Sequence, residues 1–340
     1  MKILIIGGTG LISTAITGQL IALGMDVTLY NRGKSEARIP DGAKTIHGDR
    51  KEYLAFENQM HEAGHFDCVI DMVGFAPDDA LSVVRAFSGR IGHFIFCSTV
   101  CTYGGPASRY PIREDEPRLP IGSYGANKVK CEDILMSAGD RGDFPVTVMR
   151  PSQTYGEGGT IVHSLGWRTN YLDRIRKGKP IIVHGDGSCL WAACHIDDVG
   201  RGFTNAVGNP KSYGKFYNLT GEEWMTWNRY HAGVAEALNA PTPNLVHIPA
   251  DLMAKISPKR FGISIDIFQY PSIFDNSAAI GDLGFQYTVP WVEGVRRTVA
   301  WLDQRNKIEN SDDDPFDDNV IAAWNRLGAA MAGSFAGIDD

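Results

Sequence analysis

The chain is poor in cysteine and contains no long apolar run. Its 340 residues include six cysteines and no C-x-x-C pair, a pattern that gives neither a disulfide framework nor a zinc site of the usual spacing. No apolar stretch reaches the roughly 18 residues that a membrane-spanning helix requires. We therefore expect reduced thiols, a cytoplasmic location and no membrane partner.

The chain also lacks an excess of basic residues. Its 33 lysines and arginines are outnumbered by 40 aspartates and glutamates, which gives a formal net charge of −7 and a pI near 5.7. Proteins that bind nucleic acid display basic patches for the phosphates, so no nucleic-acid partner is expected. Apolar residues at 43% and charged residues at 21% are the proportions of an ordinary globular protein.

Short apolar strands alternate with helical segments in the first half of the chain. Residues 12–23 and 80–87 have helical spacing. The expected strands are residues 3–6, 26–30, 44–47, 68–72, 93–97 and 147–150. This alternation predicts an α/β fold of the Rossmann type, in which a doubly wound parallel sheet is covered by helices on both faces.

The regular alternation ends after Pro151, where proline, glycine and tryptophan become more frequent. We expect residues 1–155 to form the cofactor-binding domain, with segments around 193–220 returning to it. Residues 156–192 and 221–340 would form a smaller α/β lobe for the substrate.

An acidic run begins at Asn310. We expect it to be solvated and to precede a last helix from Asn319 to about Met331, because carboxylates favour a helix N-terminus.

A glycine-rich turn follows the first expected strand directly. It reads Gly-Gly-Thr-Gly-Leu-Ile-Ser over residues 7–13 and opens a helix. Gly7 permits the tight turn, and Gly10 lets a pyrophosphate approach the amides at the helix N-terminus. Ser13 replaces a third glycine and is small enough for close packing of the helix on the strand. The cofactor contacts expected from this turn are Gly7, Thr9, Gly10, Leu11 and Ile12.

The end of the second expected strand indicates which dinucleotide is bound. An NAD-selective site holds an acidic residue there for the ribose 2′-hydroxyl, whereas this chain has Asn31 and Arg32. Arg32 can pair with a 2′-phosphate, so NADP(H) is favoured over NAD(H). Asp49 and Arg50 follow the third strand, where Asp49 can accept a hydrogen bond from the adenine amino group. Asp71 ends the fourth strand and is expected to line the cofactor.

A hydroxyl-bearing strand end and a Tyr-x-x-x-Lys pair supply the groups for hydride chemistry. Tyr124 and Lys128 share one helix face at i,i+4 spacing. Lys128 and the positive charge of an oxidised nicotinamide would lower the pKa of the Tyr124 phenol toward working pH. The phenolate would accept the substrate's hydroxyl proton as hydride leaves its carbon, and the reverse step would reduce a carbonyl. Tyr30 and Lys34 have the same spacing, but no such role is expected at the cofactor-selecting turn.

Six motifs occur in the order found in one enzyme family. They are Gly7-x-x-Gly10, Gly48-Asp49-Arg50, Ser98-Thr-Val-Cys-Thr-Tyr103-Gly104, Tyr124-x-x-x-Lys128, Arg150-Pro-x-x-x-Tyr155-Gly156 and His195-Ile-Asp-Asp198. With them the chain resembles the extended short-chain dehydrogenase/reductases, the NAD(P)-dependent epimerase/dehydratase family. The resemblance implies that Thr99 is the catalytic hydroxyl, with Ser98 as its neighbour. It also implies that Lys128 and Pro151 contact the cofactor and that two helices of the sheet domain form a homodimer.

One departure from the family pattern bears on the substrate. Nucleotide-sugar members usually carry an arginine for the diphosphate shortly after a Gly-Asp-Gly loop, and here that position holds Trp191. An indole offers a stacking face and one N–H donor but no charge. We therefore expect an uncharged, carbohydrate-like small molecule such as a sugar or cyclitol, with core packing of Trp191 as the alternative. Ser98, Tyr103 and Gln153 are further candidates to face the substrate.

Several functions stay open at this point. An epimerase and a net dehydrogenase would share the same three catalytic residues, so the sequence does not separate them. An NADPH-dependent carbonyl reductase of an aromatic or secondary-metabolite ketone is a second candidate. A non-catalytic RNA-binding relative is a third, which the retained Tyr124–Lys128 pair and the negative net charge disfavour.

The string His61-Glu-Ala-Gly-His65 matches a zinc-protease motif, yet no metal site is expected. That chemistry needs both histidines on one turn inside a helix. Gly64 precedes an expected strand here, so the string lies at a helix end.

Overall fold

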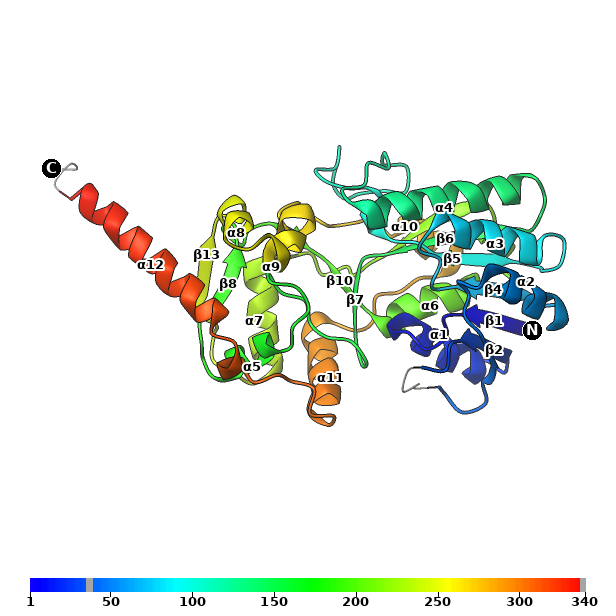
Figure 1. The fold of residues 1–340 in the computed structure, drawn as a ribbon, viewed down its shortest axis with the longest axis horizontal. Helices are drawn as coiled ribbons and strands as arrows, with labels where there is room; N and C mark the ends of the chain where they lie inside the picture. Colours follow the sequence, from blue (N-terminus) through cyan, green and yellow to red (C-terminus); the bar gives the residue numbers. More distant parts are fainter. Residues whose placement is uncertain (35–38, 337–340) are drawn as a thin grey trace. The chain divides into compact units, whose positions relative to one another are not determined.

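The computed structural model describes residues 1–34 and 39–336, and the chain divides into two compact units (Figure 1). The first unit comprises Met1–Gly156, Ala192–Glu223 and Ile273–Pro290, and the second comprises the remaining segments. Residues 273–290 had been expected in the substrate lobe. They pack with the first unit because the Asn276 side chain exchanges hydrogen bonds with the backbone of Thr220, over 3.0 and 3.2 Å.

The first unit is built on a seven-stranded sheet in which every neighbouring pair is parallel. In spatial order the strands are β3 (Lys44–His47), β2 (Asp26–Asn31), β1 (Lys2–Ile6), β4 (Cys68–Asp71), β5 (Phe94–Cys97), β6 (Val146–Pro151) and β11 (Lys215–Leu219). All the strands predicted from the sequence are present, with ends that differ by one residue at most. The order reverses between β1 and β4, which is where doubly wound sheets bind nucleotides.

Side chains of alternate residues enter two separate hydrophobic cores, one on each face of this sheet. In β1, Ile3 and Ile5 belong to one core, whereas Leu4 and Ile6 belong to the other. The first core is covered by α1 (Leu11–Ala22), α6 (Ile196–Ala206) and α10 (Ser277–Leu283), and the second by α2 (Tyr53–Glu62), α3 (Pro77–Phe87) and α4 (Ser123–Asp140). The predicted fold class is therefore confirmed.

Short elements extend this unit beyond the carboxyl ends of β5 and β6. A 3-10 turn, η1 (Val100–Thr102), follows β5, and β7 (Gln153–Tyr155) follows β6 and pairs in parallel with β10 (Ala193–His195). A second 3-10 turn, η2 (Pro210–Ser212), precedes β11.

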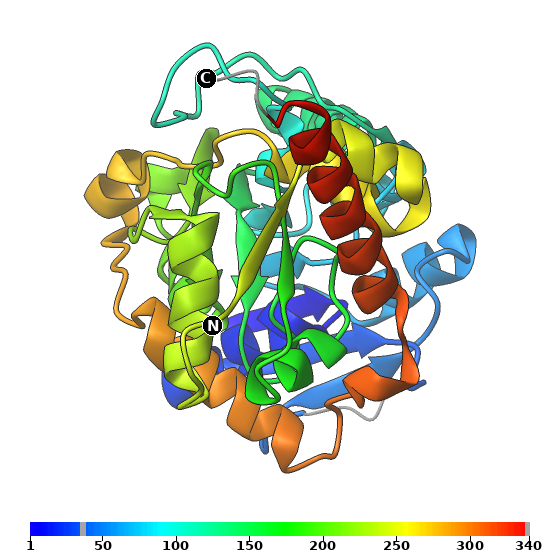
Figure 2. The ribbon, with the colours of Figure 1, turned by 90° about the vertical axis from the view of Figure 1, so that its left-hand side faces the viewer.

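The second unit is a smaller α/β region. Its strands are β8 (Ile181–His184) with β13 (Leu245–Ile248), paired in parallel, and β9 (Leu190–Trp191) with β12 (Met225–Thr226), paired antiparallel. Its helices are α5 (Asn170–Arg176), α7 (Trp227–Ala237), α8 (Ala250–Ile256), α9 (Pro258–Ile263), η3 (Ser264–Phe268), α11 (Trp291–Asp303), η4 (Ser311–Asp313) and α12 (Phe316–Ser334). Figure 2 shows β8 and β13 side by side, and residues of both join Val320 and Ile321 of α12 in one core cluster. None of the described helices is long and apolar enough to cross a membrane.

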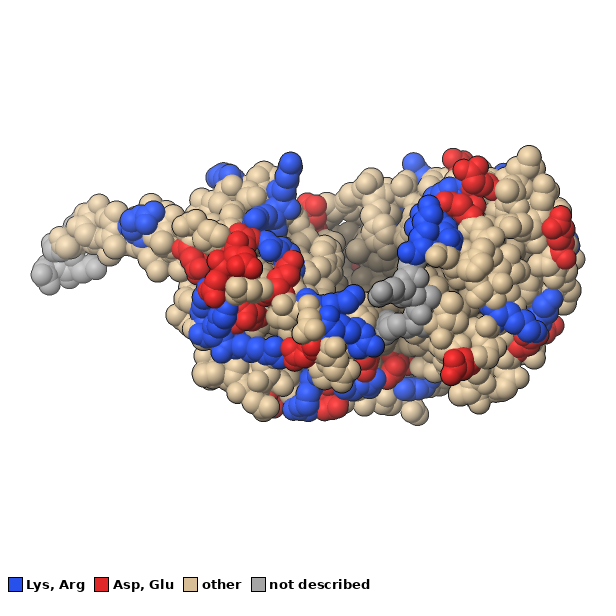
Figure 3. All heavy atoms as spheres, turned by 60° about the horizontal axis from the view of Figure 1, so that its bottom comes forward, with Lys and Arg blue, Asp and Glu red and all other residues tan. Residues whose placement is uncertain are grey.

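The acidic run that leads into α12 forms ion pairs and is solvated only in part: Asp312, Asp313 and Asp318 are exposed, whereas Asp317 is buried. Asp314 pairs with Arg168 and Arg260, and Asp318 pairs with the buried Arg174 over 2.7 Å. Asp312 pairs with Lys177 and also with Lys179. Figure 3 accordingly shows acidic and basic side chains lying beside one another on this unit. The last helix also begins earlier and ends later than predicted.

Gly104 should be indispensable to the loop that follows β5. Its φ is +74°, and a Cβ there would overlap the Leu119 carbonyl oxygen, whereas Gly89 has a φ of +67° and open space around it. We expect Gly89→Ala to lower the free energy of unfolding by about 1 kcal/mol, from backbone strain alone. Gly104→Ala should lower it by roughly 3 kcal/mol or more, because overlap with backbone adds to that strain. Urea denaturation of both variants measures this, and equal costs would contradict the packing described for this loop.

Candidate functional site

Two adjoining cavities lie at the carboxyl ends of the strands of the first unit. One, of about 370 Å³, is lined by the ends of β1 and β2 and the turn after β3, and we call it the nucleotide cavity. The other, of about 300 Å³, is lined by the turns after β1, β4, β5 and β6, and we call it the catalytic cavity. Gly7, Gly10, Val73 and Phe75 border both. The two cavities therefore meet at the point where the strand order reverses.

The glycine-rich turn after β1 is shaped by its packing. Gly7 has a φ of +84°, and a Cβ there would overlap the side chain of Val73. The Ser13 hydroxyl accepts a hydrogen bond from the Gly10 N–H over 2.7 Å and donates to the Gly7 carbonyl over 2.9 Å. Ser13 therefore stabilises the turn through its hydroxyl. It also occupies the position where the usual glycine-rich motif has a third glycine. Leu11 and Ile12 line the catalytic cavity, and N–H groups in a first helical turn have no intrahelical acceptor.

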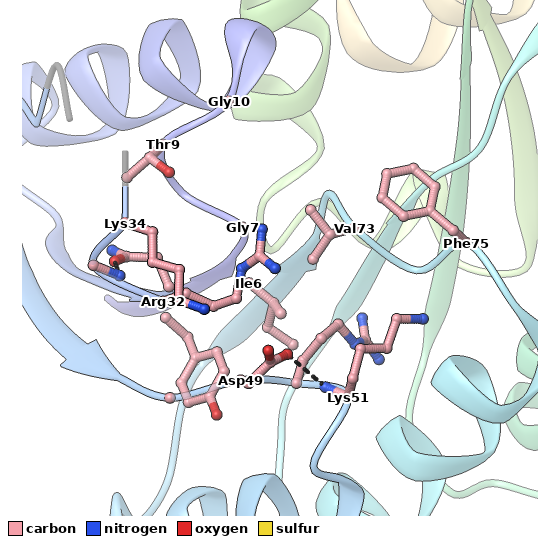
Figure 4. A pocket seen from close by; sticks show the side chains of 15 residues that line it. Ile6, Gly7, Thr9, Gly10, Arg32, Lys34, Asp49, Lys51, Val73 and Phe75 are labelled. Atoms are coloured by element: carbon pink, nitrogen blue, oxygen red, sulfur yellow. Dashed lines mark hydrogen bonds between the residues drawn. The ribbon is translucent and has the colours of Figure 1, made fainter. Parts of the chain in front are cut away.

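The end of β2 offers unused polar groups to the nucleotide cavity. Asn31 accepts a hydrogen bond from the Gly33 N–H over 2.8 Å, but its own amide nitrogen is buried and has no partner among the described residues. Arg32 is exposed and forms no ion pair with them. Figure 4 shows Thr9, Arg32 and Lys34 on one side of the cavity and Val73 and Phe75 on the other.

Asp49 and Arg50 also line the nucleotide cavity, as predicted, but Asp71 lines neither cavity. Asp49 accepts a hydrogen bond from the Lys51 N–H over 3.0 Å. Arg50 is buried and donates to the Asp71 carboxylate over 2.5 Å and to the Asp79 carbonyl over 2.8 Å. Buried charges are stable only when paired, so Arg50 and Asp71 support the turn from beneath.

These features fit a dinucleotide. The orphaned amide of Asn31 and the exposed, cationic Arg32 are donors to the nucleotide cavity without described acceptors. They are ordered along one hollow beside the glycine turn, as phosphate and ribose oxygens require.

Thr99, Tyr124 and Lys128, the three predicted catalytic residues, all line the catalytic cavity. Tyr124 and Lys128 lie in the first turns of α4, and Thr99 caps η1 by accepting a hydrogen bond from the Cys101 N–H over 3.2 Å. Although 48% of Tyr124 is exposed, burial around its hydroxyl raises the pKa of the phenol, and Cys97 and Cys101 act in the same direction. A hydrogen bond with the Thr99 side chain lowers that pKa. In the free protein the phenol therefore holds its proton.

Lys128 is almost entirely buried, with 1% of its surface exposed. Its amine donates to the Cys97 carbonyl over 2.6 Å and lies 4.8 Å from the ring centre of Phe75 and 4.7 Å from that of Phe96. It lies 6.0 Å from the centre of the Tyr124 ring. Burial lowers the pKa of Lys128, while Cys97 and Asp71 act to raise it.

The residues predicted to face substrate divide into two groups. Ser98 lines the catalytic cavity, but its hydroxyl donates to the Glu132 carboxylate over 2.5 Å. Tyr103 and Gln153 lie outside both cavities. The buried Tyr103 hydroxyl donates to Asn218 over 2.7 Å, because a phenol removed from water needs polar partners.

Trp191 belongs to the second unit, where 3% of its surface is exposed. Its ring centre lies 5.0 Å from that of Trp227 and 4.9 Å from that of Phe268. These contacts are those of core packing, the alternative stated for this residue, and leave no broad indole face for a ring of substrate.

Sequence reasoning missed several residues of the catalytic cavity. Phe75 is 45% exposed and borders both cavities, and its position after β4 at the reversal of strand order was the available signal. Ser152 and Thr154 line the catalytic cavity in place of Gln153, their neighbour on the opposite side of the strand.

Two sequence motifs to which no catalytic or metal-binding role was assigned are the Tyr30–Lys34 pair and the string from His61 to His65. Tyr30 is buried and donates to Gln59 over 2.9 Å, and α2 ends at Glu62, so His65 lies outside that helix. Within residues 1–34 and 39–336 no group of three or more His, Cys, Asp or Glu side chains is placed to hold a metal ion.

Comparisons with known proteins identify the family of the chain. The model of the NAD dependent epimerase/dehydratase family matches residues 3–220. The chain is 27% identical to 2′-dehydrokanamycin reductase of Streptomyces kanamyceticus over 255 residues, covering 75% of this chain and 71% of that protein. It is 31% identical to UDP-glucose 4-epimerase of Mycolicibacterium smegmatis over 248 residues, covering 72% and 71%. It is 28% identical to the chloroplast stem-loop binding protein of 41 kDa b of Arabidopsis thaliana over 259 residues, covering 72% and 65%.

A solved structure shows the same fold. UDP-glucuronic acid 4-epimerase from Bacillus cereus in complex with NAD superimposes with a TM-score of 0.69 at 19% identity, over 90% of this chain and 99% of that one. The resemblance inferred from the motifs is therefore confirmed. The chain belongs to the NAD dependent epimerase/dehydratase family and is an NAD(P)-dependent enzyme of the epimerase/dehydratase type.

Proposed function

We propose that the protein transfers hydride between NADP(H) and a secondary alcohol carbon of a carbohydrate-like substrate, as a reductase or as an epimerase. The observation that carries this proposal is the convergence of Thr99, Tyr124 and Lys128 on a cavity that shares the glycine turn with the nucleotide cavity. A hydroxyl, a phenol and an amine are the groups that reversible proton transfer at a carbinol needs.

A bound nicotinamide would supply or accept the hydride, and the side chains of this chain would manage the proton. In the reducing direction the Tyr124 hydroxyl donates its proton to the carbonyl oxygen. Thr99, which lines the same cavity as Tyr124, holds that oxygen by a hydrogen bond. The Lys128 amine, 6.0 Å from the Tyr124 ring, stabilises the phenolate that remains.

The nucleotide cavity favours NADP(H) over NAD(H). A 2′-phosphate requires cations and the absence of a nearby carboxylate, and the described end of β2 provides Asn31, Arg32 and Lys34. Asp49, across the cavity, already accepts a hydrogen bond from the Lys51 N–H.

The substrate proposed is a carbohydrate without a nucleotide diphosphate. Trp191 stands where nucleotide-sugar members of the resembled family carry an arginine, and its described contacts are aromatic. One relative is named 2′-dehydrokanamycin reductase, although another is named UDP-glucose 4-epimerase. A second candidate substrate is an aromatic or secondary-metabolite ketone. The exposed Phe75 ring, which lies beside Tyr124, supports it because this ring gives the catalytic cavity an apolar border.

Binding of RNA is the third candidate, because one relative is a stem-loop binding protein. The net charge of −7 and the retained catalytic residues favour the enzyme. A cytoplasmic homodimer, joined through two helices of the sheet unit, completes the proposal.

The experiment that tests the proposal is turnover of a substrate panel by the purified protein. With NADPH and keto-sugars such as 2′-dehydrokanamycin, a reductase consumes cofactor in proportion to alcohol formed. With NADP⁺ and the corresponding alcohols, an epimerase forms the isomer without net NADPH. Turnover of UDP-glucose in preference to every unphosphorylated sugar would contradict the substrate class proposed.

Arg32→Ala should change the relative affinities of the protein for NADPH and NADH. Loss of a charge-assisted pair with the 2′-phosphate should weaken NADPH binding by about tenfold to a hundredfold and leave NADH binding nearly unchanged. Fluorescence titration of both cofactors measures the ratio, with Arg141→Ala, an exposed arginine paired to Asp143, as the control. An unchanged NADPH/NADH ratio in Arg32→Ala would remove this residue from the cofactor site.

Lys128→Met should move the pH dependence of catalysis. Alcohol oxidation needs the Tyr124 phenolate, and burial raises the pKa of this phenol, so the oxidation rate should rise with pH while ketone reduction falls at alkaline pH. Removal of the amine should shift both limbs to higher pH and slow oxidation near neutrality by roughly tenfold or more. Lys130→Met, an exposed lysine of the same helix, is the control. If Lys128→Met and Lys130→Met had the same dependence of rate on pH, electrostatic support of Tyr124 by Lys128 would be contradicted.

A further inference from the structure

Glu132 is a buried carboxylate of α4 that none of the catalytic steps above uses. It lies four residues after Lys128 and eight after Tyr124, so it shares their side of the helix, and its exposed fraction is 0%. A carboxylate removed from water in this way is stable only when donors surround it.

Donors from separate segments of the first unit meet on this carboxylate. One oxygen accepts from the Ser98 hydroxyl over 2.5 Å and from Arg150 Nε over 2.9 Å. The other accepts from Arg150 Nη2 over 2.6 Å and from Arg118 Nη1 over 3.1 Å. Glu132 therefore ties the catalytic helix to the end of β5, to the end of β6 and to the loop before α4.

The link through Ser98 reaches the reacting groups directly. Ser98 stands between Cys97, whose carbonyl accepts from Lys128, and Thr99, whose side chain lines the cavity with Tyr124 and acts to lower the pKa of that phenol. The backbone of Ser98 is fixed to β6 by a 2.7 Å hydrogen bond to the Met149 carbonyl. With its hydroxyl engaged by Glu132, the Ser98 side chain can set the distance between Thr99 and the helix that carries Tyr124.

We propose that Glu132 is a positioning residue of the catalytic cavity, which acts through Ser98 to align the Thr99 and Tyr124 hydroxyls. This inference rests on the proposed roles of Thr99 and Tyr124. It reassigns Ser98 from substrate contact to support, so that Thr99 alone holds the substrate oxygen. Thr99 acts to lower the pKa of Tyr124, so loss of the link should weaken that effect and the phenol should hold its proton more tightly.

The test is an absorbance titration of the Tyr124 phenolate in the NADP⁺ complex, taken as the difference between each protein and the same protein with Tyr124→Phe. Ser98→Ala removes the link and leaves the Arg150–Glu132 pair in place. Its titration midpoint should rise by about half a unit to one unit, the size of one hydrogen bond, with little change in melting temperature. Glu132→Gln keeps an acceptor oxygen for Ser98 but removes the charge, so it should move the midpoint less than Ser98→Ala and lower the melting temperature by leaving Arg150 without its carboxylate partner.

Asp318→Asn is the matched control, because it takes a carboxylate from the buried Arg174 in the second unit. It should lower the melting temperature without moving the titration. An unmoved midpoint in Ser98→Ala, with a normal titration in the unaltered protein, would overturn the positioning role alone. Absence of any Tyr124 titration in the unaltered NADP⁺ complex would overturn the proposed function and this inference together.

Discussion

The buried amine of Lys128 is the interaction on which the site depends. A lysine can be removed from water only where other groups replace its hydration, and here the Cys97 carbonyl and the faces of Phe75 and Phe96 do so. Those partners come from the end of β5 and the turn after β4, so the amine joins α4 to both. Tyr124 is thereby held at the border where the catalytic cavity meets the nucleotide cavity.

The polar residues around that amine form two groups. One group faces the cavities, and the other forms buried pairs that connect the segments around them. Arg32, Asn31, Thr99 and Tyr124 face the cavities. The buried pairs Arg50–Asp71, Arg150–Glu132 and Tyr103–Asn218 join strand ends that are far apart in sequence. The Asp71 and Glu132 carboxylates and the Tyr103 hydroxyl in the second group are already satisfied by protein, whereas Arg50 also lines the nucleotide cavity and keeps its Nε without a described hydrogen-bond partner.

Local patterns were sufficient for most of the fold and for bringing Thr99, Tyr124 and Lys128 to one cavity. Strand positions follow from apolar runs, the cofactor turn from glycine spacing, and the Tyr124–Lys128 pair from helical periodicity. Local sequence patterns could not predict hydrogen-bond or ion-pair partners that are distant in sequence. Tyr103 bonds to a residue 115 positions away, and Asp312 and Asp318 pair with cations more than a hundred positions back. Gln153 shows a second limit, because the sequence does not indicate that Ser152 and Thr154, rather than the residue between them, line the catalytic cavity.

The central claim is that Tyr124, supported by Lys128 and aligned with Thr99, exchanges the proton that accompanies hydride transfer at this cavity. Its most direct test is transfer of deuterium from NADPH labelled at the nicotinamide C4 to 2′-dehydrokanamycin as the keto probe, in the unaltered protein and in Tyr124→Phe. The account predicts deuterium at the carbinol carbon of the product, and a rate in Tyr124→Phe lower by roughly a hundredfold or more with cofactor affinity retained. Deuterium transfer at an undiminished rate in Tyr124→Phe would contradict it.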